Sequence, residues 1–413
     1  MVSKTVAGVL PDGWRGSLIK HVCKVVRGSS PRPAGSPLYF EGDFLPWATV
    51  ADLTNSDDMY LTSTKSMLTE AGSERTRITE PGTLMLTNSG ATLGVPKISS
   101  IRCGANDGIA MLLDLDGIAI EFAYYYLYSK TQYFRDVIAP GVGQPNLNTE
   151  LIGDFPIPVP PLPEQKKIAQ ILSTWDKAIA TTEQLLANSQ QQKKALMQQL
   201  LTGKKRLLDE NGVRFEGAWE TYKFGDLFKE RVETGRDDLA LLSITADDGV
   251  VYQEDTGRKN TSNEDKSKYR RICVNDIGYN TMRMWQGRSS LSDKEGIVSP
   301  AYTIVTPTDK VCPAYAAYLF KLPALVHVFY RHSQGLVSDT WNLKFNHFKK
   351  ITWQVPSIDE QCKVATVISS ADKEITVLQQ KLDILKQEKK ALMQQLLAGK
   401  RRVKVDDKEG TKC

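Results

Sequence analysis

The chain has 413 residues, of which 41% are hydrophobic and 24% charged, and its formal net charge at pH 7 is +5. This length predicts more than one domain, and the composition is that of a globular protein rather than a disordered or fibrous one. The net charge does not by itself indicate nucleic-acid binding, because residues 1–160 carry 13 Lys+Arg against 16 Asp+Glu.

Residues 1–14 lack the long apolar core of a secretory signal, and no apolar run reaches the length of a transmembrane helix. The six cysteines and four histidines are scattered, without CxxC pairs or metal-ligand spacing. We therefore expect a cytoplasmic protein with reduced thiols, no bound metal and no membrane contact.

Residues 1–160 are interpreted as a first mixed α/β domain. Short apolar runs predict strands at 83–87 and 109–113, and a helical pattern follows at 121–136. Gly141-Val142-Gly143 leads into Gln144-Pro145 and therefore predicts a turn rather than a nucleotide-binding loop.

Residues 161–210 contain a predicted long helix that starts near Pro163 and ends at Gly203, where basic residues follow. The predicted helix has about 40 residues and would therefore be roughly 60 Å long. Apolar residues recur along it at three- and four-residue spacing and predict one apolar stripe. The stripe consists of Ile168, Ile171, Leu172, Trp175, Ile179, Leu185, Leu186, Leu196 and Leu200.

Residues 211–355 predict a second mixed domain, with a strand at 302–305 and a helical stretch at 314–330. Residues 356–403 predict a second long helix, and residues 404–413 form a tail. The second helix repeats the first without a gap, and the sequence Lys-Lys-Ala-Leu-Met-Gln-Gln-Leu-Leu-x-Gly-Lys occurs at both 193–204 and 389–400. This identity indicates an internal duplication.

An apolar stripe on a long helix needs a partner. Because the two helices share length and stripe, we favour their pairing as an antiparallel coiled coil; the alternative is that each stripe packs on its own domain. Thr182, Ser189 and Gln192 weaken the middle of the first stripe. The expected fold is α+β: two mixed α/β domains separated by two long antiparallel coiled-coil helices, with a pseudo-two-fold internal repeat.

Catalytic motifs are missing from the sequence. It has neither a GxxxxGK[ST] phosphate loop nor the Asn/Asp-Pro-Pro-aromatic motif of an amino-methyltransferase. We therefore expect a chain without an active site of its own.

Side chains suited to DNA are more frequent. Arg, Asn and Gln can form paired hydrogen bonds with base edges, whereas Lys, Ser and Thr suit phosphates. For most of them an ordinary surface position is the simpler interpretation, but Trp285 between Arg283 and Arg288 favours ligand contact, unless that indole is a buried anchor of the loop. The candidates in the first domain are Arg27, Ser29, Arg32, Arg75, Arg77, Asn88, Ser89, Thr92 and Lys97. Those in the second domain are Lys268, Arg270, Asn280, Arg283, Trp285, Gln286 and Arg288.

Several motifs recur in characteristic places along the chain. The most specific is the proline-rich entry to a long helix, Ile157-Pro158-Val159-Pro160-Pro161-Leu162-Pro163-Glu164-Gln165, with Glu360-Gln361 as its second copy. The second entry, at 355–359, is less rich in proline. Further segments are Leu10-Pro11-Asp12-Gly13-Trp14, Asn146-Leu147-Asn148 and residues 88–94, 279–287 and 296–302. Together these motifs resemble the specificity subunit of a type I restriction-modification system, and the resemblance covers essentially the whole chain.

The resemblance implies two target-recognition domains, residues 1–160 and 211–355, each reading one half of a bipartite asymmetric site in double-stranded DNA. The helices would set the spacing and dock two modification subunits. S-adenosylmethionine, ATP and Mg²⁺ would be held by those subunits and by restriction (motor-nuclease) subunits, not by this chain. The assembled complex would be an adenine-specific DNA methyltransferase and ATP-dependent endonuclease. A protein-interaction scaffold with two binding domains on a coiled coil is the alternative.

Overall fold

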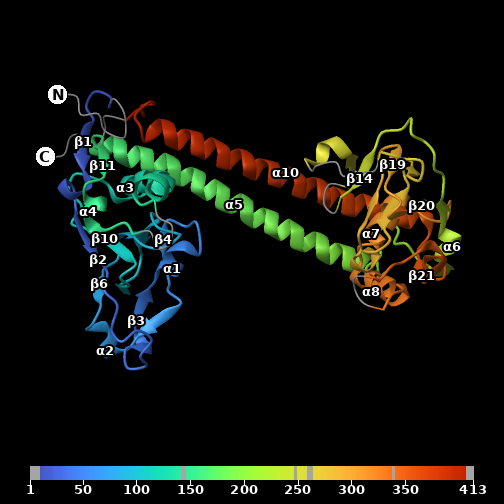
Figure 1. Ribbon diagram of the computed structural model, residues 1–413, viewed down its shortest axis with the longest axis horizontal. Helices are drawn as coiled ribbons and strands as arrows, with labels where there is room; N and C mark the ends of the chain where they lie inside the picture. The colour runs from blue at the N-terminus through green and yellow to red at the C-terminus, as the bar shows by residue number, and fades with distance from the viewer. Residues whose placement is uncertain (1–9, 141–145, 246–248, 258–263, 337–339, 406–413) are drawn as a thin grey trace. The chain divides into compact units, whose positions relative to one another are not determined.

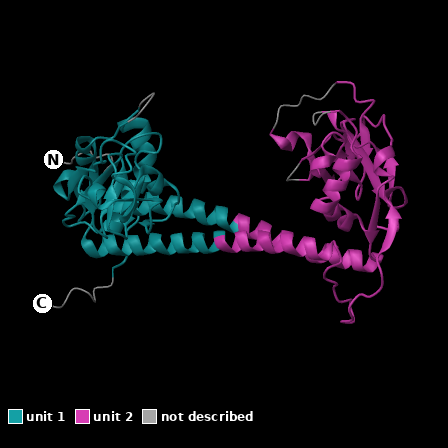
Figure 2. Cartoon of the chain, turned by 90° about the horizontal axis from the view of Figure 1, so that it is seen from below, with its two compact units in different colours: residues 1–183, 381–413 teal, residues 184–380 magenta. Residues whose placement is uncertain are grey.

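The computed structural model describes residues 10–140, 146–245, 249–257, 264–336 and 340–405. The chain divides into two compact units: unit 1 comprises residues 1–183 and 381–413, and unit 2 comprises residues 184–380 (Figure 2). Each unit contains one globular domain and a segment of each of two long helices, α5 (Leu162–Leu200) and α10 (Ile358–Leu396). The turn predicted at Gly141–Gly143 and residues 406–413 of the predicted tail lie outside the described residues.

The globular domain of unit 1 contains a five-stranded sheet of order β2-β10-β7-β8-β4, a four-stranded sheet of order β5-β3-β9-β6, and the pair β1–β11 (Figure 1). The strands predicted at 83–87 and 109–113 correspond to β7 and β10. The strands are β1 (Arg15–Leu18), β2 (Lys24–Arg27), β3 (Phe40–Ala48), β4 (Tyr60–Leu61), β5 (Ser66–Leu68), β6 (Arg77–Thr79), β7 (Leu84–Thr87), β8 (Pro96–Ser99), β9 (Cys103–Ala105), β10 (Ile109–Leu113) and β11 (Pro156–Val159).

The helix predicted at 121–136 is α3 (Ile120–Tyr133), which continues as a π-helical turn, η2 (Phe134–Ile138). Four of its aromatic side chains, Phe122, Tyr124, Tyr125 and Tyr126, are buried in the core of unit 1, and Tyr128 and Tyr133 are partly buried against it. The shorter helices of the unit are η1 (Ile19–His21), α1 (Val50–Thr54), α2 (Glu70–Ser73) and α4 (Thr149–Gly153).

The globular domain of unit 2 contains a four-stranded sheet of order β13-β20-β17-β18 and three strand pairs, β12–β21, β14–β15 and β16–β19. Its strands are β12 (Glu220–Lys223), β13 (Phe228–Arg231), β14 (Leu242–Ile244), β15 (Val250–Tyr252), β16 (Arg270–Ile272), β17 (Ile277–Asn280), β18 (Ser289–Leu291), β19 (Gly296–Val298), β20 (Tyr302–Pro307) and β21 (Thr352–Val355). Its helices are α6 (Phe224–Leu227), η3 (Gln253–Thr256), η4 (Met284–Gln286), α7 (Pro313–Leu319), α8 (Pro323–His332) and α9 (Phe345–Phe348).

The single helical stretch predicted at 314–330 is wrong, because the structure has two helices there. Helix α7 ends at Leu319, and α8 begins at Pro323 after the extended N-cap residue Leu322. Proline lacks the amide hydrogen that a continuous helix needs, but its fixed φ suits the first turn of a new one.

The two globular domains share a frame that sequence patterns did not reveal. The order β2-β10-β7-β8 in unit 1 recurs as β13-β20-β17-β18 in unit 2. The pair β1–β11, which precedes α5, likewise recurs as β12–β21, which precedes α10. The internal duplication therefore extends from the helices into the domain cores.

Within unit 1 the segments of α5 and α10 pack both on each other and on the domain. Ile168 and Leu172 of α5 share one core cluster with Leu396 of α10 and with Phe122 of α3. Asp176 forms an ion pair with Lys389, and Glu183 forms one with Lys386 at 2.7 Å. Since the partners run in opposite directions along the two segments, the segments are antiparallel in this unit.

Unit 2 repeats this arrangement. Lys193 of α5 pairs with Asp372 of α10, and the Ser189 hydroxyl donates to Glu374 at 3.2 Å. Leu200 and Ile368 join the core of the domain. In each unit, therefore, the two interpretations of the apolar stripe hold together: the helix segments contact each other and also cover their own domain.

One residue of the predicted stripe of the first helix needs a correction. Helix α5 stops at Leu200, and Gly203, at which the helix was predicted to end, takes a left-handed φ of +71° just beyond it. Leu185, assigned to the apolar stripe, is 48% exposed, whereas Leu186 is buried. Adjacent helical residues point about 100° apart, so Leu185 turns away from the face that buries Leu186.

A set of polar contacts, here called the entry clamp, holds the start of each long helix. In unit 1 the buried carboxylate of Glu164 accepts two hydrogen bonds from Arg402, at 2.7 and 2.9 Å, and a third from the indole of Trp14 at 3.0 Å. In unit 2 the buried carboxylate of Glu360 accepts two from Arg206, at 2.6 and 2.7 Å.

The next residue completes each clamp. The Gln165 amide accepts from the N–H of Ala119 at 2.7 Å and donates to the carbonyl of Pro160 at 2.8 Å. The Gln361 amide accepts from the N–H of Cys312 at 3.0 Å and donates to the carbonyl of Pro356 at 2.8 Å. Each glutamine therefore satisfies backbone groups at the junction between domain and helix, whereas each glutamate binds the side chains that close the clamp.

Candidate nucleic-acid interface

Four exposed arginines lie near the turn between β9 and β10 of unit 1. The Arg27 guanidinium donates to the carbonyl of Asp107 at 2.6 Å, and the Arg32 guanidinium pairs with the Asp107 carboxylate at 3.3 Å. Arg77 donates to the carbonyl of Arg27. Arg75 is exposed two residues earlier. We call Arg27, Arg32, Arg75 and Arg77 the arginine surface.

Backbone contacts join the segments that carry the arginine surface. The amide of Ser29 donates to Ala105 at 2.9 Å, and its carbonyl accepts from the Thr76 hydroxyl at 2.7 Å. A side chain at Gly28 would collide with the carbonyl of Asn106, since an added Cβ would lie 2.1 Å from that oxygen. The close approach that glycine permits lets the backbone at Gly28 lie against Asn106, which is far away in the sequence.

The loop after β7 presents its predicted polar residues unevenly. Thr92 is exposed and Ser89 half-buried, with a β-bridge from Ser89 to Asn146. Asn88 is fully buried, and neither atom of its side-chain amide has a hydrogen-bond partner among the described residues. Burial of both amide atoms means that this side chain is not displayed for base contact in the structure described.

Lys97 also differs from a surface phosphate contact. It lies in the fully buried strand β8, where its ammonium group donates to the carbonyls of Ser56, at 2.9 Å, and Asp58. Removal from water lowers the pKa of Lys97, with Asp58 and Asp57 acting in the opposite direction. Its visible role is to fix the 56–58 segment against the sheet.

The loop at 280–288 in unit 2 is compact and carries five predicted residues. The Asn280 side chain accepts from the amide of Met282 at 3.0 Å, and the Trp285 indole donates to the Met282 carbonyl at 3.0 Å. The amide of Gln286 donates to the carbonyl of Arg283 at 2.9 Å. Arg283, Gln286 and Arg288 are exposed, so the loop displays two guanidinium groups and one amide.

Sequence reasoning missed the side chains that support this loop. Trp341 makes an edge contact with Trp285, with ring centroids 5.2 Å apart, and another with Tyr330 of α8 at 4.9 Å. The Lys321 ammonium donates to the carbonyl of Gly287 at 2.8 Å. Trp285 is only partly buried, so its indole both anchors the loop and borders solvent. A partner at position 341 cannot be read from local spacing.

Arg270 and Lys268 lie in different surroundings. Arg270 pairs with Glu230 at 2.8 Å, and the neighbouring Arg271 bonds Glu233 and Glu295. Arg231 is bound twice by the buried carboxylate of Asp276, at 2.6 and 3.2 Å. Lys268 is exposed. The arginines near β13 and β16 thus have carboxylate partners, unlike those of the 280–288 loop, for which the described residues include none.

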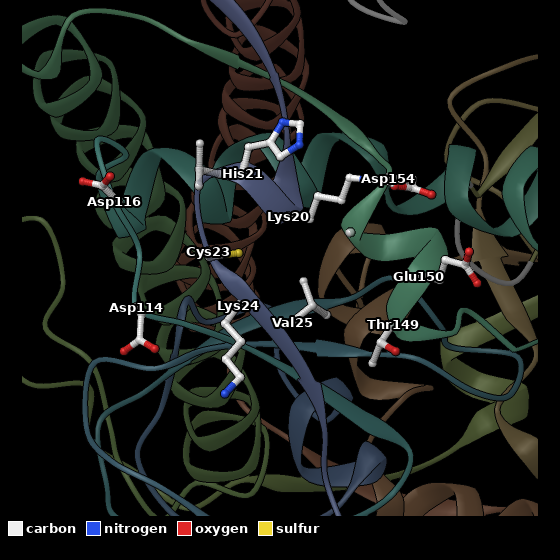
Figure 3. A pocket seen from close by; sticks show the side chains of 12 residues that line it. Lys20, His21, Cys23, Lys24, Val25, Asp114, Asp116, Thr149, Glu150 and Asp154 are labelled. Carbon is white, nitrogen blue, oxygen red and sulfur yellow. Dashed lines mark ion pairs between the residues drawn. The ribbon is translucent and has the colours of Figure 1, made fainter.

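A pocket of about 630 Å³ opens in unit 1 at the start of β2 (Figure 3). Lys20 pairs with Asp154 there at 2.5 Å, and burial raises the pKa of the Cys23 thiol to about 12, which keeps it protonated near neutral pH. Carboxylates outnumber basic groups in the lining, which disfavours a phosphate. The charged lining residues are Lys20, His21, Lys24, Asp114, Asp116, Glu150 and Asp154.

In the described part of the chain, no group of three or more His, Cys, Asp or Glu side chains is placed to hold a metal ion. Within the same ranges, no helix combines the length and the apolarity that crossing a membrane requires. What the geometry does offer is two polar surfaces, the arginine surface of unit 1 and the 280–288 loop of unit 2, whose groups suit phosphates and base edges.

Comparison with known proteins agrees with surfaces that suit DNA. Residues 11–188 match the model of the type I restriction modification DNA specificity domain. The type I restriction enzyme MjaIX specificity subunit of Methanocaldococcus jannaschii is 30% identical over 250 residues, which cover 56% of this chain and 55% of that protein. The putative MjaX specificity subunit of the same organism is 23% identical over 310 residues, 68% of each. The chain thus spans about half the length of the first of these relatives.

Solved structures show the same fold at low sequence identity. The type I restriction-modification S subunit from M. genitalium gives a TM-score of 0.57 at 15% identity, covering 95% of this chain and 99% of that one. The HsdS subunit from Thermoanaerobacter tengcongensis gives 0.50 at 14%, covering 96% and 100%. The resemblance noted from the motifs is therefore confirmed. Residues 11–188 match the type I restriction modification DNA specificity domain, and the chain is similar in sequence and fold to specificity subunits of these systems.

Proposed function

We propose that this chain is the non-catalytic subunit that selects the DNA sequence for a type I restriction-modification complex. Each globular domain reads one half of a bipartite, asymmetric site in double-stranded DNA. The arginine surface supplies contacts in unit 1, and the 280–288 loop supplies them in unit 2. A DNA partner of this kind is also the basis for expecting the chain in the cytoplasm.

The observation that carries the proposal is a repeated frame with unlike surfaces. Both domains use the same four-strand order and the same Glu-Gln pair at the helix entry. On this frame unit 1 displays arginines around Asp107, whereas unit 2 displays Arg283, Gln286 and Arg288 on one braced loop. A duplicated reader of two different half-sites needs this combination, because the frame fixes position while the exposed groups decide which bases are accepted.

In the proposed complex α5 and α10 pair as an antiparallel coiled coil, set the distance between the half-sites and dock two modification subunits. The antiparallel ion pairs within each unit support this arrangement. S-adenosylmethionine is assigned to the modification subunits, and ATP with Mg²⁺ to the restriction subunits. The assembled complex, not this chain, would then methylate adenine and cleave DNA.

Exchange of residues 211–355 for the equivalent domain of a relative tests the proposal. The complex with its modification subunits should change one half of the sequence that it methylates and keep the other, as read by methylation-sensitive sequencing. If this chain were a scaffold without a role in DNA reading, the complex would methylate the same sequence after the exchange. A change in both halves would contradict independent reading by the two domains.

A further inference from the structure

The most exposed apolar side chain on the 280–288 loop is Met282, which is 50% exposed. It lies beside Arg283 in the sequence, and Gln286 and Arg288 are exposed on the same loop. An exposed methionine next to groups that suit base edges gives the surface an apolar contact as well as hydrogen-bond donors.

The exposure of Met282 is built into the loop rather than left to a mobile backbone. Its amide is held by the Asn280 side chain at 3.0 Å, and its carbonyl is held by the Trp285 indole at 3.0 Å. Trp285 in turn rests against Trp341, and the ring of Trp341 rests against Tyr330. Both ends of the methionine residue are therefore fixed by side chains, and its own side chain is kept outside the core.

Base pairs offer one apolar group in the major groove, the C5-methyl of thymine, and apolar side chains recognise it by contact. Arginine suits guanine and glutamine suits adenine, so neither distinguishes thymine by an apolar contact. Among the exposed residues of the loop, which are Met282, Arg283, Gln286 and Arg288, Met282 alone has the apolar chemistry for that methyl group.

We infer that Met282 is a specificity-determining residue that contacts a thymine C5-methyl group in the half-site read by unit 2. The inference rests on the proposed function. 5-Methylcytosine carries the same methyl group, and we assign thymine because it is the base that ordinarily presents it.

The test uses the full chain assembled with its modification subunits and duplexes that carry its own recognition sequence, found by methylation mapping. Each thymine in the half-site of unit 2 is replaced in turn by deoxyuridine, which removes only the methyl group. Binding is measured by fluorescence anisotropy for the unmodified chain and for Met282→Ala. We expect one replacement to weaken binding about three- to fivefold, the effect of one lost apolar methyl contact, and to have no effect with Met282→Ala.

Two variants serve as matched controls. Met282→Leu keeps an apolar side chain and should keep the sensitivity to deoxyuridine. Val274→Ala removes another exposed apolar side chain of unit 2, 54% exposed and away from the loop, and should leave binding unchanged. Since both substituted side chains are exposed, the fold should persist in all three variants.

The inference is overturned if the half-site has no thymine, if no deoxyuridine weakens binding, or if the effect persists with Met282→Ala. A gain on placing 5-methylcytosine at a cytosine position, dependent on Met282 and without any deoxyuridine effect, would assign the methyl group to cytosine and also overturn it. Arg283→Ala and Arg288→Ala separate this failure from failure of the proposed function: if neither weakens binding, the loop is not the reading surface at all.

Discussion

The entry clamps of the two units are built from the same residue types but are completed differently. In unit 1 three hydrogen bonds reach the Glu164 carboxylate, one of them from Trp14. In unit 2, among the residues that the structure describes, Arg206 is the one donor that reaches the Glu360 carboxylate. The buried indole N–H of Trp219 has no hydrogen-bond partner within the described part of the chain, and the Arg206 guanidinium lies 6.0 Å from that ring.

The comparison shows that two copies of the same motif need not contribute equally to stability. A second donor to a buried carboxylate provides a reserve when the first is removed, and a buried donor without an acceptor costs free energy. Unit 1 has the reserve and unit 2 has the unpaired donor. The same clamp should therefore respond differently to the same substitution in the two units.

The largest difference is expected on removal of the arginines. Arg206→Ala should lower the stability of unit 2 by about 3 kcal/mol, because it leaves the buried Glu360 carboxylate unpaired. Arg402→Ala should lower that of unit 1 by only about 1–2 kcal/mol, since Trp14 still donates to Glu164 and the Arg402 side chain is already 46% exposed. Hydrogen exchange in increasing denaturant, followed on peptides from each unit, measures both losses.

Arg401→Ala, which removes an exposed guanidinium next to Arg402, is the control and should change neither unit measurably. Equal losses for Arg206→Ala and Arg402→Ala would contradict the reserve assigned to Trp14.

The second comparison lies within unit 1, between a buried and an exposed cation. Lys97→Met should lower stability by about 2 kcal/mol, because the carbonyls of Ser56 and Asp58 lose their donor, with no change in the salt dependence of DNA binding. Arg75→Ala should leave stability unchanged and reduce the salt slope by about one phosphate contact. Titrations at several salt concentrations distinguish the two. A reduced slope for Lys97→Met would show that its ammonium group reaches DNA after all.

A smaller difference in stability between the units is expected for the hydrogen bond that joins each domain to the helix segment beside it. The Tyr125 hydroxyl donates to Asp176 at 2.5 Å in unit 1, and the Tyr318 hydroxyl donates to Asp372 at 2.7 Å in unit 2. Loss of a hydrogen bond to a carboxylate costs about 1.5 kcal/mol. Tyr125→Phe should show this loss, because Tyr125 is fully buried, and Tyr318→Phe should cost less, because Tyr318 is only partly buried. Hydrogen exchange in denaturant measures both losses of stability. A larger loss for Tyr318→Phe than for Tyr125→Phe would show that burial does not set the strength of this contact.

The smallest effects concern the tryptophans of the two clamps. Trp14→Phe removes the donor to Glu164 and should cost about 1 kcal/mol. Trp219→Phe removes an unpaired donor, so the gain from that removal should offset part of the lost packing and leave a change near zero. Thermal unfolding of the two variants, with exchange data to assign each transition to its unit, provides the measurement. A larger loss for Trp219→Phe would mean that its N–H finds a partner in solution.

Much of the architecture could be predicted from the sequence because the signals are local. The stripe from Ile168 to Leu200 specified α5, and the apolar run at 109–113 specified β10, since periodicity and length depend only on neighbouring residues. The break between α7 and α8 also follows from local chemistry, because Pro323 cannot continue a helix but suits the first turn of a new one. The nearly identical sequences at the ends of the two long helices likewise predicted a repeated unit.

The candidate interface was only half predictable. Arg27, Arg32, Arg75 and Arg77 were selected as residue types, and Arg283 and Arg288 as members of one loop, but nothing local distinguished these arginines from Arg270, which pairs with Glu230. Lys97 has the residue type of a phosphate contact and the burial of a core residue. Whether a cation faces solvent depends on which acceptors the fold places around it.

The sequence by itself determined the duplication, the long helices and the residue types available for DNA. Tertiary structure alone decided that Arg402 closes the clamp of Glu164 while Arg206 closes that of Glu360, and that Trp341 supports Trp285. These partners are far apart in the chain, and their pairing depends on the path of the intervening backbone. Periodicity and propensity describe one segment at a time, whereas burial and hydrogen-bond satisfaction are properties of the packed whole.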